Sequence, residues 1–423
     1  MKVERLFFCK KESIMKPSYL RLKYACYTTN ITMSIVGNLS PILFLTFRSL
    51  YGISYSLLGL LVFVNFTTQL IVDLIFSIFS HRFNIPKTVK VTPVIAVAGL
   101  LFYALCPFLF PNRVYLGLLI GTIIFSSASG LAEVLISPVI AALPAENPDR
   151  EMSKLHSIYA WGVVGVVIFS TLFLIGFGHE NWQWLALIFM LVPLFSAILF
   201  QYSEVPELET PERVQGVLDM LTNKTLWWCV LAIFLGGASE CTMAQWSSGY
   251  LEQALGIPKV WGDIFGVALF GVMLGMGRSL YAKIGRNVEK ALFMGAIGAT
   301  LCYFVATVSG HPIIGLLACG FTGFCTSMLW PGSLVVASDR ISTGGVFIYA
   351  MMAAGGDLGA AVGPQLVGVV TDVVINTEAL VAKAMEWGLT AEQLGMKCGM
   401  LVGMLFPLVA IFVYWHHVKM AKS

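Results

Sequence analysis

The sequence predicts an all-α membrane protein with twelve transmembrane helices in two pseudo-symmetric bundles of six. Three observations lead to this fold class. The 423 residues are 57% hydrophobic and only 12% charged, with a mean hydropathy of +0.82, which is too little charge to cover a soluble globule. Twelve apolar runs approach or exceed the roughly 20 residues that cross the hydrocarbon of a bilayer. One polar segment divides these runs into two sets of six.

The apolar runs follow one another along the chain with short connections. The first set of helices is expected at 22–47, 56–79, 91–110, 114–141, 156–177 and 182–201. The second set is expected at 226–250, 260–282, 290–308, 312–336, 344–373 and 395–417. Each range is long enough to span a bilayer.

The polar segment from Gln201 to Lys224 is rich in Glu and contains two prolines, so we interpret it as the linker between the two halves. The expected division is an N-terminal segment at 1–21, a first bundle at 22–201, a linker at 202–225, a second bundle at 226–418 and a tail at 419–423.

The basic residues predict the orientation. With the N-terminus in the cytoplasm, all but five of the 26 Lys and Arg fall on the cytoplasmic side, so the positive-inside rule places both termini in the cytoplasm. We expect the protein in the cell membrane. The exceptions are Arg48, Arg113, Lys259, Lys383 and Lys397. Lysines interrupt the N-terminal apolar stretch, so no cleavable signal peptide is expected. Both Met1 and Met15 stay open as the start of translation.

Short motifs resemble the major facilitator superfamily. The segment 277–286, with Gly277-Arg278 and Gly285-Arg286, looks like the cytoplasmic signature of that superfamily in its second-half copy. The segment 155–162, LHSIYAWG, is similar to the opening of helix five in fucose permease-like members. Segments 132–138 and 355–364 point to the same branch, whose members are sugar:proton symporters. The resemblance implies alternating access, with Arg278 and Arg286 in gating contacts.

Two motifs depart from the pattern of the family, at three positions. His81 and Asn84 stand where the first-half signature has an acidic residue and a glycine. Pro41 stands where the fucose permease has a coupling aspartate, so a relay of two carboxylates does not carry over.

Three carboxylates lie deep within the apolar runs: Glu133, Glu240 and Asp357. A charge at bilayer depth costs several kcal/mol, roughly, and persists where water, a partner or a ligand reaches it. This placement favours a transporter.

Two polar stripes accompany such residues. Glu133 shares a helical face with Ser126, Gly130 and Ser137, at intervals of three or four, and such a face is expected to line a cavity. A structural hydrogen bond is the alternative for Glu133. Asn65, Gln69 and Asp73 form a second stripe at intervals of four, for which a structural clamp and a transport role both stay open.

The helix expected at 226–250 brings an acid, an amide and a large aromatic ring together as Glu240, Gln245 and Trp246. A polyhydroxylated ligand needs such directional hydrogen bonds and an apolar face. Asp357 lies among small residues, which favour a gating or packing contact over a direct ligand role.

The candidate residues fall into three groups. Proton coupling is expected from Glu133, Asp73 and Glu240. Substrate binding is expected from Asn38, Glu133, Tyr159, Trp161, Glu240, Gln245, Trp246, Trp330 and Tyr349. Gating or packing contacts are expected from Arg278, Arg286 and Asp357.

The expected function is secondary active transport of a small polar, sugar-like solute, with import coupled to protons. No catalytic motif, cofactor or metal site is expected, because the nine cysteines form no CxxC pair and no nucleophile or phosphate-binding motif occurs. The net charge of +3 reflects topology, not nucleic-acid binding. We expect a monomer in the lipid bilayer. An exporter of the same fold and a non-transporting nutrient sensor remain the alternatives.

Overall fold

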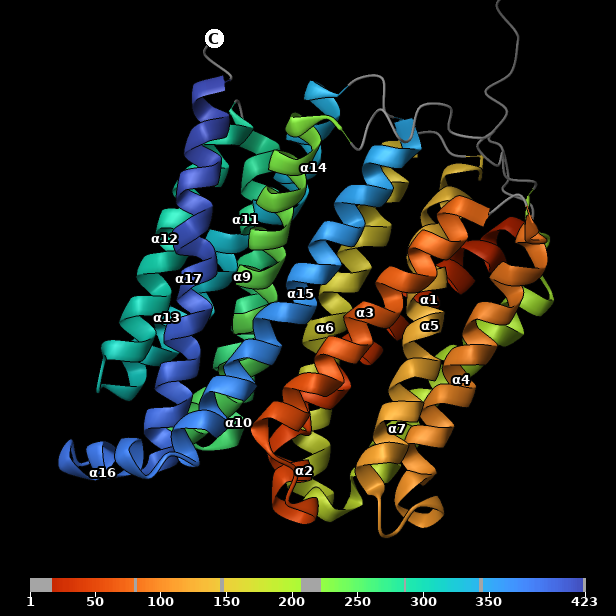
Figure 1. The fold of residues 1–423 in the computed structure, drawn as a ribbon. Helices are drawn as coiled ribbons and strands as arrows, with labels where there is room; N and C mark the ends of the chain where they lie inside the picture. Colours follow the sequence, from red (N-terminus) through yellow and green to blue (C-terminus); the bar gives the residue numbers. More distant parts are fainter. Residues whose placement is uncertain are drawn as a thin grey trace, which may run out of the picture.

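The computed structural model describes residues 17–79, 82–144, 148–206, 222–284, 287–341 and 345–420. Within these ranges the chain is almost entirely helical and contains no strand (Figure 1). The predicted positions His81 and Arg286 lie outside the described residues, as do the side chains of His156 and Tyr349.

The helices of the first half are α1 (Pro17–Ile42), α2 (Phe44–Tyr51), α3 (Tyr55–Phe79), α4 (Ile85–Leu109), α5 (Val114–Ala141), α6 (Pro148–Phe177), the short η2 (His179–Asn181) and α7 (Trp182–Gln201). Those of the second half are α9 (Lys224–Leu255), α10 (Lys259–Gly262), the π-helix η3 (Asp263–Ala268), α11 (Leu269–Ile284), α12 (Val288–Val308), α13 (Pro312–Thr326), α14 (Leu329–Arg340), α15 (Gly345–Ile375), α16 (Glu378–Glu386) and α17 (Ala391–Met420).

Among the described residues, eleven helices are long and apolar enough to cross a membrane, and the bent pair of α1 and α2 supplies a twelfth span. The predicted ranges 114–141 and 182–201 agree with α5 and α7 at both ends. Two expected helices are interrupted. The first bends by 45° between Ile42 and Phe44, and the tenth is divided into α13 and α14.

The bend follows Pro41, which lies in the last turn of α1. Proline has no backbone N–H and therefore cannot bond to the carbonyl four residues earlier, which belongs to Gly37. The helix ends one residue later, at Ile42, and the freed Gly37 carbonyl accepts a hydrogen bond from Gln245 of α9.

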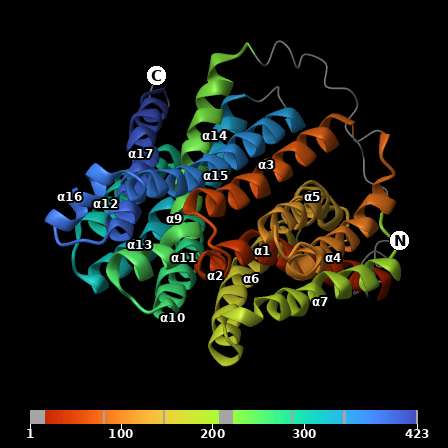
Figure 2. The ribbon, with the colours of Figure 1, turned by 60° about the horizontal axis from the view of Figure 1, so that its bottom comes forward.

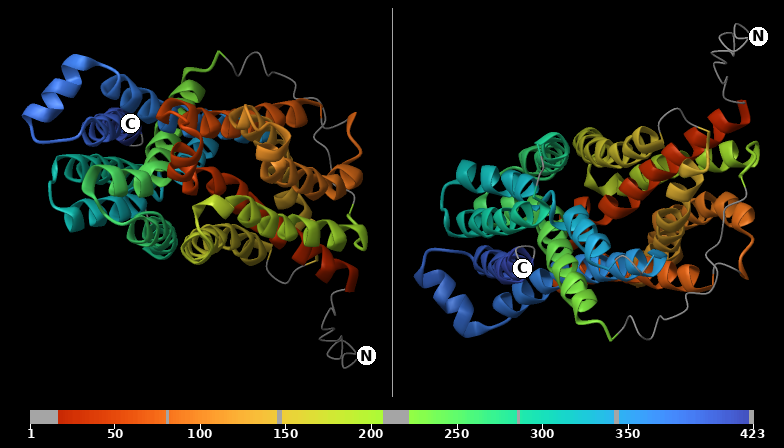
Figure 3. Two further views of the ribbon diagram at one scale, coloured as in Figure 1. Left: turned by 90° about the horizontal axis from the view of Figure 1, so that it is seen from below. Right: turned by 90° about the horizontal axis from the view of Figure 1, so that it is seen from above.

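The two halves meet along matching helices. α3, the second span, packs along α15, the eleventh, and α6, the fifth, packs against η3 and α11, the eighth. A two-fold operation that exchanges the halves converts the first contact into the second. Figures 2 and 3 show the two groups of helices side by side with these elements between them.

The start of α1 and the end of α17 lie on the same side of the bundle, which we call the terminal side (Figure 1). The opposite side carries α2, α10 and α16, and we call it the α16 side. α16 runs across the direction of the other helices at the outer edge of the second half.

Glycines let α9 and α15 pack backbone against backbone. A Cβ atom on Gly359 would lie 2.0 Å from the Phe234 carbonyl oxygen, and one on Gly363 would lie 2.2 Å from Thr242 Oγ1. These contacts fix the position of the segment of α15 that carries Asp357. Such small residues allow close approach where lipid supplies no hydrophobic drive.

Gly359→Ala is therefore expected to separate α9 from α15 and to lower stability by about 1–3 kcal/mol, the usual cost of overpacking. Thermal unfolding of the purified protein measures the loss. Gly275→Ala is the matched control, because nothing lies within 4 Å of a Cβ atom there. Equal melting temperatures for the two variants would contradict this account of the packing.

An ion-pair cluster joins α1 to α6 on the terminal side. Glu151 contacts Lys23, accepts hydrogen bonds from Lys154 Nζ at 2.7 Å and from Tyr27 Oη at 3.1 Å, and lies outside the spanning part of α6. The hydrogen bonds from Lys154 and Lys23 lower the pKa of Glu151 to about 2.

A lowered pKa stabilises the folded state above the ordinary pKa of the carboxyl group, and this contribution is lost as the pH falls toward the folded value. Glu151→Gln is expected to unfold at a lower temperature than the wild type at neutral pH, because its contacts lose the charge. The gap should narrow as the pH is lowered from about 4.5 toward about 2. Melting curves of both proteins over this range test it, and a gap that does not depend on pH would contradict it.

Candidate functional site

The two predicted polar stripes meet between α3 and α5. Ser126 Oγ donates a hydrogen bond of 2.5 Å to Asn65 Oδ1, and Gln69 Nε2 donates one of 3.2 Å to the same oxygen. One turn further along, a Cβ atom on Gly130 would lie 2.9 Å from Asp73 Oδ1. Gly130 therefore leaves the room that the Asp73 carboxylate occupies.

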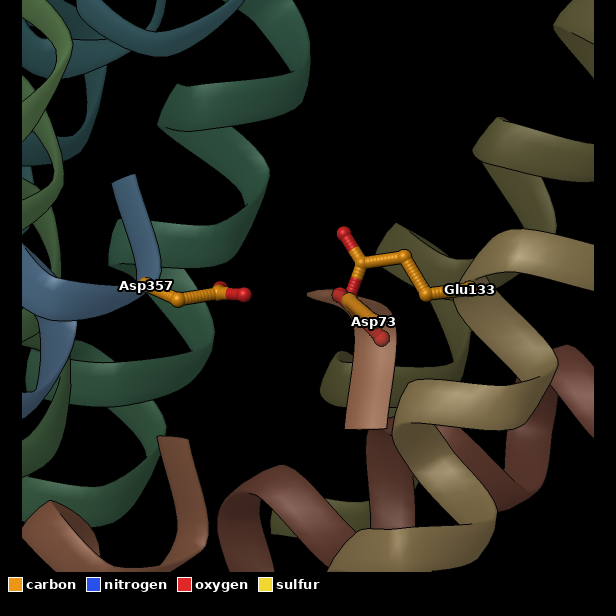
Figure 4. A group of neighbouring side chains, drawn as sticks. All are labelled: Asp73, Glu133 and Asp357. Carbon is orange, nitrogen blue, oxygen red and sulfur yellow. The ribbon is translucent and has the colours of Figure 1, made fainter. Parts of the chain in front are cut away.

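Three carboxylates converge at the end of this ladder. Asp73 of α3, Glu133 of α5 and Asp357 of α15 each place one oxygen so that all three lie within 4.8 Å of one another. Figure 4 shows Asp357 pointing from the second half toward the two acids of the first half. We call these residues the carboxylate cluster. It joins the two halves in space.

The carboxylate cluster has no matching positive charge among the described residues. Asp73 is 6% exposed and Asp357 is 3% exposed, while Glu133 keeps more accessible surface than either. Both Asp73 oxygens and Asp357 Oδ2 are buried without a hydrogen-bond partner in the described part of the chain. Desolvation and mutual repulsion disfavour three full charges at this spacing. The cluster can therefore hold protons or a cation.

Glu240, the third deep acid of the sequence, lies in an ion pair within the second half. Arg278 Nη2 is 3.4 Å from Glu240 Oε1, and Arg278 Nε donates to the Ser327 carbonyl at 3.1 Å. The Arg278 side chain is 40% exposed. Tyr159 of α6 is 36% exposed and lies close enough to Glu133, Glu240 and Arg278 for their charges to act on it. Tyr159 therefore lies near both Glu133 of the cluster and the Glu240–Arg278 pair.

On the α16 side the two halves are joined by charge. The Asp372 carboxylate of α15 accepts hydrogen bonds from the backbone N–H groups of Tyr55 at 3.1 Å and Ser56 at 2.7 Å, at the start of α3. Arg48 of α2 pairs with Glu392 of α17 at 2.7 Å. Asp372 thus satisfies the free donors at the positive end of a helix in the opposite half.

A second set of contacts joins the halves closer to the centre. Gln245 Nε2 donates to the Gly37 carbonyl at 3.3 Å, the group that Pro41 leaves free. Trp246 is fully buried, with its ring 4.9 Å from that of Phe44, and its Nε1 donates to the Pro364 carbonyl at 2.8 Å. Neither side chain offers an open face to a ligand in this conformation.

Asp263 was not among the predicted site residues, yet it is completely buried in the first turn of the π-helix η3. It accepts a hydrogen bond of 2.9 Å from Thr171 of α6, contacts Ser248, and pairs with Lys259 at 3.1 Å. The spacing of four residues between Lys259 and Asp263 was the available sequence signal. Thr171 makes this a further link between the halves.

Among the candidates whose side chains the structure describes, Asn38, Trp161 and Trp330 lie outside the cluster. Asn38 is buried and donates to the Ser34 carbonyl within its own helix at 2.8 Å. Trp161 is 70% exposed, two residues from Tyr159 and therefore on another face of α6. The Trp330 ring fills the space beside Gly237 and Gly356.

Comparisons with known proteins agree with this fold. A family model described as Major Facilitator Superfamily matches residues 25–364. A search of curated proteins gives no match.

Several solved structures share the fold. A bacterial homologue of the human lysosomal transporter Spinster, in an inward-facing and occupied conformation, has 13% identity over 95% of this chain and 96% of its own, with a TM-score of 0.68. The E. coli fucose:proton symporter FucP has 14% identity over 94% and 99%, with a TM-score of 0.61. The E. coli xylose transporter XylE, partially occluded and inward open, has 14% identity over 94% and 97%, with a TM-score of 0.68.

The cap that Asp372 places on α3 predicts how the α16 side opens. Hydrogen bonds to a charged group contribute about 1.5–3 kcal/mol, so Asp372→Asn should favour opening of this side by roughly tenfold or more. Electron-spin distance measurements between labels at Arg113 and Glu378, in a cysteine-free background, report the separation of the halves. A longer distance population is expected in Asp372→Asn and not in Asp339→Asn, an exposed acid on the other side. An unchanged distribution would contradict the role given to this cap.

Proposed function

The chain belongs to the major facilitator superfamily, and we propose that it imports a small polar, sugar-like solute together with protons by secondary active transport. It is a multi-pass membrane protein and a transporter, not an enzyme. The observation that carries the proposal is the carboxylate cluster, in which acids from both halves converge without a basic partner in the described chain. Proteins of similar fold include symporters of fucose and xylose with protons.

The moving units are the bundles 22–201 and 226–418, joined by the linker 202–225, and they rock about the cluster. The contacts of Asp372, Arg48 and Thr171 hold the α16 side closed. Closure of the opposite side would separate the cluster from water, and a carboxyl group without water favours its neutral form. Opening of that side would return the cluster to water, which favours the charged form. The protonation of Glu133 thereby follows the alternation.

The solute lies beside the cluster, against Tyr159, Glu240 and Arg278. Tyr159 offers a hydroxyl group and a ring, and the exposed part of the Arg278 guanidinium offers donors for hydroxyl oxygens. Gln245 and Trp246 act at the closed side, through their contacts with Gly37 and Phe44. Gln245 and Trp246 therefore affect transport by closing the two halves, not by contact with the solute.

The protein acts as a monomer in the cell membrane, with both termini in the cytoplasm. The distribution of Lys and Arg supports this orientation. The α16 side is then external, and the structure is closed to the outside.

Glu133→Gln is expected to abolish accumulation of solute driven by a pH gradient, reducing it at least about tenfold, because the amide cannot release a proton. Uptake into proteoliposomes, with and without an acidic exterior, measures this. Exchange of labelled for unlabelled solute across the membrane should persist, because it needs no net proton movement. Asp339→Asn is the matched control.

Retention of pH-driven accumulation by Glu133→Gln would remove Glu133 from coupling. Binding without any flux in the wild type would identify a sensor instead. Flux only from the cytoplasmic to the external side would identify an exporter.

A further inference from the structure

We propose that the carboxylate cluster binds a primary ammonium group of the solute, so that the cargo is an amine-bearing polar molecule rather than a neutral sugar. The inference rests on the proposed function and narrows its substrate class. It is carried by the positions of Asp73, Glu133 and Asp357.

The spacing of the oxygens fits an ammonium group. An R–NH₃⁺ group has three donors in tetrahedral directions, each at about 2.8 Å from a carboxylate oxygen, so three acceptors around it lie about 4.6 Å apart. The oxygens of the cluster lie within 4.8 Å of one another. One ammonium nitrogen can therefore reach all three acids with little movement.

The acids are also free to accept. Asp73 and Asp357 are each more than nine-tenths buried, and Figure 4 shows Asp357 aimed at the two acids of the first half. Both oxygens of Asp73 and Oδ2 of Asp357 lack hydrogen-bond partners among the described residues. Buried acceptors without partners carry a desolvation cost that a charged donor relieves.

The balance of charge favours a cationic solute. A proton alone neutralises a single coupling acid, whereas three acids lie close together here: Asp73, Glu133 and Asp357. Arg278 already pairs with Glu240. One ammonium group offsets one negative charge, which leaves another acid able to carry the coupled proton. The proposal is therefore compatible with co-transport.

A metal ion fits less well. Calcium takes six to eight oxygen ligands and magnesium takes six in a near-ideal octahedron. Three carboxylates complete such a shell only with both oxygens of each acid or with added water. An ammonium group is satisfied by three acceptors.

The remainder of the solute would lie toward the accessible groups. Glu133 keeps accessible surface, Tyr159 is partly exposed near it, and Arg278 is partly exposed near Tyr159. Hydroxyl groups of a polyhydroxylated amine can bond to these side chains while the nitrogen lies between the acids.

The test compares three probes that differ at one position: glucosamine, N-acetylglucosamine and glucose. Affinity for the full-length protein is measured calorimetrically in an amine-free buffer at a slightly acidic pH, where the amine is protonated. Glucosamine is expected to bind at least about tenfold more tightly than either neutral probe, which corresponds to about 1.4 kcal/mol. Asp73→Asn and Asp357→Asn should each remove this preference, while Asp339→Asn keeps it.

The wild-type comparison needs no variant, so it decides the matter even if an aspartate variant fails to fold. Equal affinity for glucosamine and glucose would overturn the proposal. If calcium chloride or sodium chloride alone stabilises the protein, and glucosamine does not reduce this stabilisation, the cluster is a metal site. That result would also overturn the proposal.

The outcomes separate this inference from the proposed function. Uptake of a neutral sugar with protons, without preference for the amine, leaves the proposed function standing and removes the ammonium site. Preferential binding of glucosamine without any flux in proteoliposomes leaves the ammonium site standing and removes transport.

Discussion

A carboxylate inside a membrane must be matched by water, a proton or a cation, and the architecture of this protein follows from how each buried acid meets that requirement. Asp263 is matched by Lys259 and two hydroxyl groups, and Glu240 is matched by Arg278. Asp73 and Asp357 have no such match in the described chain. Asp263 and Glu240 therefore have fixed partners from the protein. Asp73 and Asp357, which lie where the halves meet, are left to be matched by water, a proton or a cation.

The charged contacts between the halves and the unmatched acids occupy different levels of the bundle. The inter-half contacts of Asp372, Arg48 and Asp263 lie toward the α16 side, and each uses a charge whose partner belongs to the opposite half or to a neighbouring helix. The cluster lies beyond them. One side is thus closed by charged groups with fixed partners, while the acids beside it lack them. Alternating access requires such an asymmetry, since a ligand shifts the equilibrium only if the two conformations offer it different contacts.

Much of the fold follows from composition, because apolar runs closed by polar residues or proline predict α5 and α7 to the residue. The bend after Ile42 could not be predicted from composition, since the apolar run continues past Pro41 without a change. Helical spacing correctly placed Glu133 and Asp73 on polar faces, and these faces do meet. It could not show which helix faces Asp357, because periodicity describes one helix at a time. The same limit hid the pairing of Glu240 with Arg278 and the cap of Asp372 on α3.

That cap has a consequence for how opening can be observed. The backbone N–H groups of Tyr55 and Ser56 are protected by an acceptor that belongs to the other half of the molecule, not to their own helix. When the α16 side opens, the acceptor leaves and water takes its place at the first turn of α3. The exchange of these two amide hydrogens with deuterated solvent would then proceed only through the open state. The exchange rate of these two amides at the start of α3 would therefore report how often the two halves separate in the unmodified protein.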